Sequence, residues 1–184
     1  MTSTSAVILV GGASSRMGRD KALMEIDEQP AATRMARLLG DSGFLSVRLV
    51  GGSGDRFHGV PCEHVPDLVV GRGPLEGIRT TLKTAEEEWT LVLAVDLIAV
   101  DRVAIARMRE ALADHPFDDV ILATCSEGPQ PLFAWWRRSS IQTIDRELML
   151  ERRSLRNMTS LLRVASVEFP SEVLRNVNRP EDLG

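Results

Sequence analysis

The segment from Leu9 to Lys21 has the composition of a phosphate-binding loop, with the sequence LVGGASSRMGRDK. The adjacent pair Gly11 and Gly12 lets the backbone turn sharply and approach a ligand closely. Successive backbone N–H groups in such a turn form a nest that binds anions. Arg16 can grip phosphate oxygens bidentately, whereas Lys21 supplies a mobile point charge. The segment therefore predicts a binding site for a polyphosphate.

This loop differs from two common phosphate-binding motifs. A Walker A motif needs Gly-Lys-Ser/Thr at the start of a helix, and that tripeptide is absent here. The dinucleotide fingerprint needs the spacing Gly-x-Gly-x-x-Gly, which the loop also lacks. Turns rich in glycine and serine are common, and residues 19–21 alone fit a solvated turn. The complete string, directly after an apolar segment, favours phosphate binding.

Two apolar segments are predicted to position this chemistry. Residues 6–10 (AVILV) end at Gly11, and residues 90–95 (TLVLAV) end at Asp96. Continuous apolar runs without alternation are typical of strands buried on both faces of a parallel sheet. The carboxyl ends of parallel strands meet at one edge of a sheet, where ligands bind at a switch in strand order. Gly11 and Asp96 are therefore expected at the same ligand-binding edge.

The other segments complete an alternating pattern of strands and helices. Alternation of this kind indicates right-handed crossovers and a mostly parallel sheet covered on both faces. The sequence therefore predicts a three-layer, Rossmann-like α/β fold. The further strands are predicted at residues 47–50, 63–65, 120–124, 131–136 and 164–169, and the helices at 31–39, 75–88, 103–113, 141–150 and 155–162.

Length and composition narrow the class of protein. A chain of 184 residues with 43% hydrophobic and 26% charged residues can bury one complete core. We expect a single domain over residues 1–184, with a nucleotide-binding half at about 1–100 and an acceptor-binding half at about 101–184. The net charge of −4 argues against a dedicated nucleic-acid binder, which needs a basic surface.

The cysteines and the apolar segments indicate the compartment. Cys62 and Cys125 are far apart and form no CxxC pair, so neither a zinc site nor a disulfide framework is indicated. Free thiols suit a reducing cytosol. No apolar run reaches the length that a membrane span or a signal peptide needs. We therefore expect a cytoplasmic protein that binds neither membrane nor nucleic acid.

The N-terminal loop resembles the signature L-x-G-G-x-S-x-R-M-G-x-D-K of the molybdenum cofactor guanylyltransferase family and its MobA-like nucleotidyltransferase relatives. Every fixed position of that signature is met between Leu9 and Lys21. The resemblance extends from about residue 5 to the end of the chain. Further segments similar to the family are Asp67 followed by GPLEGI at 73–78, VLAVD at 92–96, the weaker match QPL starting at Gln130, and NVNRPEDL at 176–183.

Three positions depart from the family pattern. The family follows the aspartate with a proline-containing turn, whereas residues 97–99 here are Leu-Ile-Ala, which predicts a looser turn after Asp96. An asparagine often follows the second strand in the family, but residues 51–52 here are both glycine, so one base or ribose contact is missing or supplied differently. Arg179 replaces the usual threonine before Pro180.

The resemblance implies nucleotidyl transfer, in which a terminal phosphate of an acceptor attacks the α-phosphorus of a nucleoside triphosphate and pyrophosphate leaves. Because the acceptor phosphate is already a nucleophile, catalysis rests on alignment and charge neutralisation. The implied catalytic residues are Arg16, near the β- and γ-phosphates, and Lys21, near the α-phosphate or the acceptor phosphate. Asp96 is implied as the ligand of Mg²⁺, the expected cofactor, because magnesium takes one or two carboxylates together with phosphate oxygens. A helix N-cap is the alternative role for Asp96, but Asp101 fits that role better by position.

The resemblance also implies which residues contact the two substrates. Asp67 is implied at the nucleotide, with an ordinary turn after Pro66 as its alternative role. Asn178 is implied near the acceptor and the metal, with a cap or turn before Pro180 as its alternative role. Gln130 is the other acceptor-binding candidate. The implied nucleotide-binding residues are Leu9, Gly11, Gly12, Ser14, Ser15, Arg16, Lys21, Asp67, Gly73, Pro74, Leu75 and Asp96.

Gly11 bears on the choice of base. Guanylyltransferases of this type carry Gly-Gly in the loop, whereas cytidylyltransferase relatives often carry Ala-Gly, so the pair at 11–12 favours GTP over CTP. As a physical hypothesis, the missing Cβ at position 11 gives a purine more room. GTP and molybdopterin are thus the implied substrates. Transient contacts with enzymes of cofactor biosynthesis or with molybdoenzymes are implied as well.

Two other functions stay open at this point. The same loop serves relatives that transfer nucleotides to sugar phosphates or isoprenoid-precursor phosphates, because it handles only the triphosphate. The other alternative is a GTP-binding regulatory protein without catalysis. The departure at residues 97–99 supports that alternative, and the intact Arg16, Lys21 and Asp96 oppose it.

Overall fold

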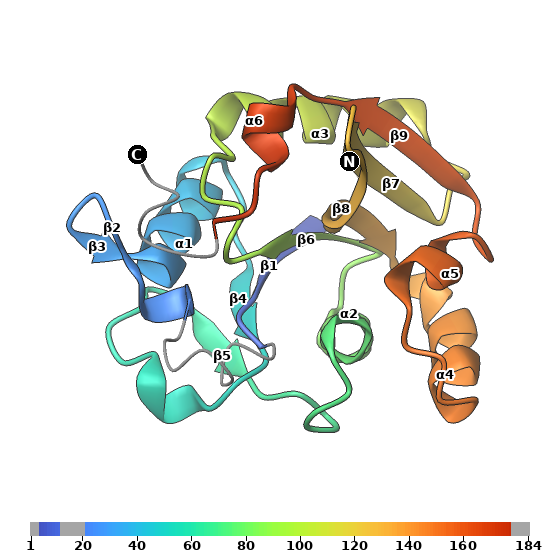
Figure 1. Cartoon of the computed structure of the whole chain (residues 1–184), viewed down its shortest axis with the longest axis horizontal. Helices are drawn as coiled ribbons and strands as arrows, with labels where there is room; N and C mark the ends of the chain where they lie inside the picture. The colour runs from blue at the N-terminus through green and yellow to red at the C-terminus, as the bar shows by residue number, and fades with distance from the viewer. Residues whose placement is uncertain (1–3, 12–20, 178–184) are drawn as a thin grey trace.

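The computed structural model describes residues 4–11 and 21–177. Its central element is a sheet of seven strands in the order β5-β4-β1-β6-β8-β7-β9 (Figure 1). The chain passes from β1 to one side of the sheet and returns for β6 on the other side, so the order of strands switches at β1. The strands are β1 (Thr4–Leu9), β4 (Val47–Val50), β5 (Glu63–Val65), β6 (Trp89–Ala94), β7 (Val120–Cys125), β8 (Gly128–Arg137) and β9 (Val164–Glu168).

Most neighbouring strands of this sheet are parallel, as predicted. β1 pairs in parallel with β4 and β6, β4 with β5, and β7 with β9. β8 is antiparallel to both of its neighbours, β6 and β7. This strand is longer than the predicted 131–136, because it pairs with β7 as a hairpin in which Cys125 lies opposite Gly128.

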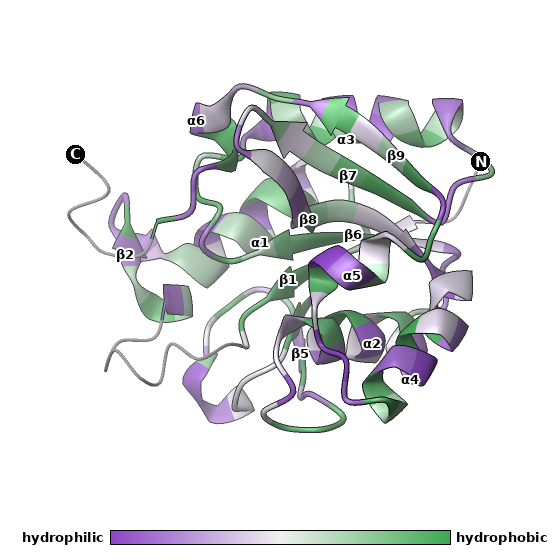
Figure 2. Ribbon diagram, turned by 45° about the vertical axis from the view of Figure 1, so that its right-hand side comes forward, coloured by the Kyte–Doolittle hydropathy of each residue, from purple (hydrophilic) through white to green (hydrophobic). Residues whose placement is uncertain are grey.

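Helices cover both faces of the sheet and give the expected three layers (Figure 1). One hydrophobic cluster joins the sheet to α1 (Ala31–Asp41), α3 (Arg102–Asp114) and α6 (Ser171–Leu174). A second cluster joins the opposite face to α2 (Pro74–Thr84), α4 (Ile141–Met149) and α5 (Leu155–Thr159). Consecutive residues of β1 alternate between the two clusters, so this strand is buried on both faces. Figure 2 shows the resulting hydrophobic colouring of β1 and β7.

Two helices are shorter than the sequence predicts. α2 ends at Thr84 rather than at residue 88. Three glutamates follow at 86–88, and acidic side chains at a helix C-terminus oppose the helix dipole. α5 ends at Thr159 rather than at residue 162, because the amides of residues 161 and 162 bond to carbonyls three residues back and tighten the chain into a turn. Among the described residues, no helix is long and apolar enough to cross a lipid bilayer.

Several short elements escaped the sequence prediction, because a few residues carry no periodic pattern. The strands β2 (Glu25–Ile26) and β3 (Gln29–Pro30) form a small antiparallel hairpin directly before α1. Its turn places Asp27 and Glu28 at φ values of 49° and 63°. The described 3₁₀ helices are η2 (Lys21–Leu23), η3 (Gly54–Arg56) and η4 (Arg138–Ser140).

α3 begins with a side-chain cap at Asp101. Its Oδ1 accepts a hydrogen bond of 2.8 Å from the backbone N–H of Ala104. A carboxylate at this position accepts a hydrogen bond from one of the amides that lack a partner within the helix. Its negative charge also interacts favourably with the positive end of the helix dipole. Asp101 therefore takes the capping role that the sequence predicts for it, and Asp96 is left for another role.

Replacing this cap is expected to weaken the fold. Asp101→Ala removes the acceptor for the Ala104 amide, and such losses cost about 1 kcal/mol. Thermal unfolding followed by circular dichroism should show a lower melting temperature. The matched control is Asp114→Ala at the exposed C-terminal end of α3, which should not lower it, because an acidic residue there opposes the helix dipole. Equal losses in the two variants would contradict the capping role.

Candidate active site

The residues that follow β1, β4 and β5 approach one another closely. A Cβ built at Gly11 would lie 3.2 Å from Oδ2 of Asp67 and 3.2 Å from Cα of Gly51. A Cβ at Gly51 would lie 2.9 Å from Cα of Gly11, and Gly51 has a φ of 94°. Side chains rarely tolerate such distances or such a φ, so both positions favour glycine. The close approach brings Asp67 beside the start of the predicted phosphate-binding loop.

This geometry gives Gly11 a structural role besides the expected one. The sequence alone suggests that the missing Cβ makes room for a purine. The atoms nearest to that Cβ position belong instead to the protein, namely to Asp67, Gly51 and Gly52. The glycine therefore allows the strand ends to pack against each other, and its effect on the choice of base stays a prediction.

A charged pair lies where the order of strands switches. Lys21 begins the 3₁₀ helix η2, and Asp96 comes shortly after the end of β6. Nζ of Lys21 donates to Oδ2 of Asp96 over 2.8 Å. The two side chains are 23% and 18% exposed, so the pair is partly shielded from water but still accessible. Two opposite charges that are 75 residues apart in the sequence thus meet at the edge between β1 and β6.

Buried contacts hold the turn that follows Asp96. Leu97 is fully buried, and Ile98 is buried beside it. Arg34 on α1 donates from Nη1 to the carbonyl of Ile98 over 2.8 Å. The backbone N–H of Val177 donates to the carbonyl of Asp96 over 2.9 Å. Residues 97–99 therefore form a turn that buried side chains and hydrogen bonds hold in place. The absence of the family's proline had predicted a looser turn.

Asp67 is a carboxylate in a shielded environment. Its Oδ1 is buried and accepts no hydrogen bond within the described part of the chain. Burial, followed by repulsion from Glu76, raises the pKa of the Asp67 carboxyl above its ordinary value, and His64 opposes part of this rise. Raised carboxyl pKa values are common where proteins bind or transform ligands. Asp67 therefore changes its ionisation closer to neutral pH than a solvated aspartate does.

Some of the predicted nucleotide-binding residues can contribute only backbone groups. The side chains of Leu9 and Leu75 are buried in the hydrophobic cluster beneath α2. Gly73 precedes that helix with a φ of 76°, and Pro74 occupies its first position. Proline loses no helical hydrogen bond there, since the first N–H groups of a helix have no intrahelical partner. Gly73 and Pro74 thus determine where α2 begins, and any ligand contact that Leu9 or Leu75 makes is through the main chain.

Gln130 lies on β8 at the same edge of the sheet. Because β8 is antiparallel to β6, its first residues neighbour the end of β6, which leads to Asp96. Gln130 is half-buried and pairs with Ala123 beside an irregularity in β7. It stands between two of the residues that line a groove of about 320 Å³ between the β7–β8 hairpin and α5. The lining residues are Leu122, Glu127, Gly128, Pro129, Pro131, Arg156 and Thr159.

Part of the predicted site falls outside the described residues. These positions are Gly12, Ser14, Ser15 and Arg16 in the loop and Asn178 near the C-terminus. Lys21, which follows the loop, and Val177, which precedes Asn178, both contact Asp96. The described structure therefore brings the ends of both segments to the same aspartate.

Two groups that act on Asp67, Glu76 and His64, could not be recognised from the sequence. Glu76 is fully buried in the first turn of α2, and His64 on β5 bonds through Nε2 to the carbonyl of Gly51 over 2.8 Å. The sequence does indicate that Gly51, the partner of His64, lies at the site, because this glycine follows an apolar strand as Gly11 does. The sequence gives no such indication for Glu76, since a glutamate near the start of a helix ordinarily faces water.

Cys62 does not provide a nucleophile. Both cysteines are free and half-buried. Burial raises the pKa of the Cys62 thiol to about 11, so it stays protonated at neutral pH. A nucleophilic cysteine needs the thiolate form. The described residues also contain no cluster of three or more histidine, cysteine or carboxylate side chains that could hold a metal by themselves.

Comparison with known proteins adds evidence on the family. A family model described as the MobA-like NTP transferase domain matches residues 6–167. A "Probable molybdenum cofactor guanylyltransferase" from Opitutus terrae is 33% identical to this chain, over 95% of this chain and 90% of its own length. A relative with the same name from Pelotomaculum thermopropionicum is 32% identical, over 100% of this chain and 91% of its own length.

Solved structures share the fold. The "Molybdopterin-guanine dinucleotide biosynthesis protein A" of Archaeoglobus fulgidus has a TM-score of 0.75 and 21% identity, covering 97% of this chain and 94% of that chain. The 2-C-methyl-D-erythritol 4-phosphate cytidylyltransferase of Thermus thermophilus has a TM-score of 0.69 and 15% identity, covering 100% of this chain and 96% of that chain. At such identities the likeness concerns the fold alone.

The fold and the sequence relatives together define the class of protein. This chain is a nucleotidyltransferase, an α/β enzyme with a signature loop after its first strand. It belongs to the MobA-like NTP transferase family, which confirms the resemblance of its N-terminal loop.

The close approach of the strand ends predicts an effect on stability. Gly51→Ala places a Cβ 2.9 Å from backbone atoms of Gly11 at a φ of 94°. Gly59→Ala is the matched control, because its φ of 87° is similar but no atom lies within 4 Å of the added Cβ. The left-handed conformation costs roughly 1–2 kcal/mol in both variants. We expect Gly51→Ala to lose at least about 1 kcal/mol more through overpacking. Urea unfolding of both variants measures the difference, and equal losses would argue against the close approach.

Proposed function

We propose that this chain transfers GMP from GTP to the terminal phosphate of molybdopterin, with Mg²⁺ as cofactor, and releases pyrophosphate. The observation that carries the proposal is the Lys21–Asp96 pair, 2.8 Å apart at the switch in strand order and at the end of the signature loop. Relatives at 33% and 32% identity bear the name molybdenum cofactor guanylyltransferase, which supports the choice of GTP and of the acceptor.

The proposed reaction forms one phosphorus–oxygen bond and breaks another. An oxygen of the acceptor's terminal phosphate bonds to the α-phosphorus of GTP. The bond from that phosphorus to the oxygen bridging to the β-phosphorus breaks, and its electron pair leaves with pyrophosphate. The attacking phosphate is already anionic, so the chain need not supply a strong base. It must supply alignment of the two substrates and compensation of their negative charge.

Lys21 is the described residue best suited to charge compensation. Its ammonium group has three N–H donors, and Asp96 accepts from one of them over 2.8 Å. Asp96 therefore positions the ammonium group, whose positive charge can compensate the negative charge of a bound triphosphate. Removing a preorganised charge of this kind costs about a hundredfold or more in rate. Arg16, outside the described residues, is proposed at the β- and γ-phosphates.

The chemistry of Asp96 fits a magnesium site. It offers a carboxylate, and the described residues contain no larger cluster of ligating side chains that would favour another kind of metal. Magnesium typically combines one or two carboxylates with substrate phosphates and water. When bound, the ion supplies positive charge against the triphosphate.

The groove beside Gln130 is the proposed position for the ring system of the acceptor. Leu122 and Pro131 give it apolar walls, and Glu127 and Arg156 contribute opposite charges. A pterin is a flat ring with neighbouring N–H donors, so a carboxylate and apolar walls are suitable partners for it. An arginine in the same groove is a suitable partner for a phosphate or another anionic group.

A second acceptor class would keep the same chemistry. The structural likeness to a cytidylyltransferase for 2-C-methyl-D-erythritol 4-phosphate supports transfer of CMP to a sugar-type phosphate as the alternative. A GTP-binding regulator without activity is disfavoured, because the family is one of transferases and the Lys21–Asp96 pair is intact.

Pyrophosphate release tests the proposal directly. Each reaction contains Mg²⁺, molybdopterin and one of GTP, CTP or ATP, with Lys21→Ala as the impaired control. We expect release with GTP only, and a loss of about a hundredfold or more in Lys21→Ala. Release with CTP instead would preserve the chemistry and overturn the choice of base. No release with any nucleotide, despite measurable GTP binding, would overturn the choice of acceptor.

The proposed metal site predicts a changed dependence on Mg²⁺. Asp96→Asn replaces a carboxylate by a neutral amide, so the Mg²⁺ concentration for half-maximal activity should rise by about tenfold or more. Asp101→Asn is the matched control, because asparagine caps a helix as well as aspartate does. An Mg²⁺ requirement in Asp96→Asn equal to that of the wild type would contradict metal binding at Asp96.

A further inference from the structure

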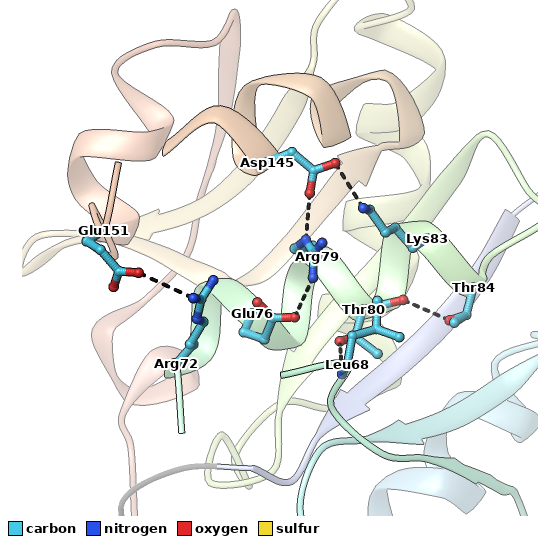
Figure 3. Close-up of polar contacts among 9 residues, drawn as sticks. All are labelled: Leu68, Arg72, Glu76, Arg79, Thr80, Lys83, Thr84, Asp145 and Glu151. Carbon is cyan, nitrogen blue, oxygen red and sulfur yellow. Dashed lines mark hydrogen bonds and ion pairs between the residues drawn. The ribbon is translucent and has the colours of Figure 1, made fainter. Parts of the chain in front are cut away.

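A glutamate is buried where α2 begins. Glu76 is fully buried, and its Oε1 accepts a hydrogen bond of 2.9 Å from Nη1 of Arg79, one turn further along the helix (Figure 3). Its Oε2 is also buried and accepts no hydrogen bond within the described part of the chain. Removing a carboxylate from water is unfavourable unless hydrogen bonds compensate it. A half-compensated glutamate at this position therefore requires a functional explanation.

Arg79 is itself held by α4. Its Nε donates to Oδ1 of Asp145 over 2.6 Å, and Lys83 pairs with Oδ2 of the same carboxylate at 2.9 Å (Figure 3). Burial alone would raise the pKa of the Asp145 carboxyl, but hydrogen bonds from Arg79 and Lys83 lower it overall. The hydrogen bond to Asp145 likewise raises the pKa of Arg79. Arg79 therefore keeps its charge and its place beside Glu76 across the physiological pH range.

The segment that carries Asp67 lies against the same turns of α2. The backbone N–H of Leu68 donates to Oγ1 of Thr80 over 3.0 Å (Figure 3). A Cβ built at Gly77, the residue after Glu76, would lie 3.9 Å from Oδ1 of Asp67. Oδ1 of Asp67 and Oε2 of Glu76 are thus two buried carboxylate oxygens without hydrogen bonds near the start of one helix.

These two carboxylates act on each other electrostatically. Neighbouring carboxylates in a shielded site resist ionising together, so one of them keeps its proton to higher pH. Glu76 is paired with Arg79, so Asp67 is the carboxyl whose pKa rises. Burial, and then Glu76, raise the pKa of the Asp67 carboxyl. The other charged group that acts on Asp67 is His64 from β5, and its effect is opposite.

We propose that Glu76 is a positioning residue of the nucleotide site, whose buried charge sets the pH range over which Asp67 accepts a hydrogen bond from the ribose or base. The inference rests on the proposed function, because it takes Asp67 as a nucleotide contact. An ionised Asp67 accepts hydrogen bonds from hydroxyl or N–H groups, and a protonated one has less capacity to accept. Nucleotide affinity therefore rises as the pH increases through the pKa of Asp67, and Glu76 moves that rise to higher pH.

The first measurement follows the ionisation of Asp67 without any nucleotide. Glu76→Gln removes the charge but keeps the shape, and its amide oxygen can still accept from Arg79. Carbon-13 NMR of the Asp67 carboxyl, from about pH 3 to pH 8, should show a midpoint lower by about half a pH unit or more in this variant. Asp145→Asn is the matched control, because it changes the same chain of ion pairs at the group remote from Asp67. It should leave the midpoint unchanged.

The second measurement determines the GTP dissociation constant over the same pH range. Below both midpoints, Glu76→Gln should bind GTP about threefold more tightly than the wild type, and the two proteins should converge at about pH 8. Asp67→Asn removes the titrating group and supplies the baseline for every other pH-dependent effect on binding. A purely structural role for Glu76 would change the affinity by the same factor at every pH.

The possible outcomes separate this inference from the proposed function. An unchanged Asp67 midpoint in folded Glu76→Gln overturns the inference, whatever nucleotide the chain binds. A lower midpoint without a matching change in the pH dependence of affinity overturns it too. If the wild type binds CTP rather than GTP, the choice of base is wrong, and the same pair of measurements made with CTP decides the inference.

Discussion

The parallel pairing of β1 with β4 and β6 is the constraint on which the rest of this structure depends. Every residue of β1 pairs with a residue of β6, and the last four also pair with β4. Because the register is common to all three strands, the backbone leaves them at the same edge of the sheet. Both faces of β1 are packed in hydrophobic clusters, so burial resists any slip of that register. The glycines and charges of the candidate site take their positions from this edge.

Electrostatics at this edge depends on shielded pairs rather than on the net charge of the chain, which is −4. Lys21 and Asp96 form one pair, and Glu76 and Arg79 form another on α2, the helix that follows Asp67. Partial removal from water strengthens such interactions, because the local dielectric constant falls. An acidic protein can therefore offer a cation to a triphosphate, provided that a carboxylate holds the cation in place.

Elements with long apolar runs could be predicted from the sequence, and short or context-dependent ones could not. The strands at 6–10 and 90–95 follow from unbroken hydrophobic runs, since only burial on both faces suits such runs. The β2–β3 hairpin has too few residues for a pattern, and the antiparallel direction of β8 depends on how β7 and β8 pair in space. Within the site, Lys21 was identified as a cation of the signature loop, and Asp96 by its position directly after a strand. The burial of Glu76 could not be predicted, because a glutamate near the start of a helix ordinarily faces water.

The sequence by itself determined the class of this protein, the loop that belongs to it and the candidate charges, because these are properties of local residue order. The tertiary structure alone decided which of those groups meet. It placed Nζ of Lys21 2.8 Å from Oδ2 of Asp96 and bonded the carbonyl of Asp96 to the amide of Val177. It also packed Gly11 against Gly51 and Asp67. It also buried the side chains of Leu9 and Leu75, so that these residues can contact a ligand only through the main chain. Distances and shielding between residues far apart in the chain arise only when the layers pack, so no local pattern could contain them.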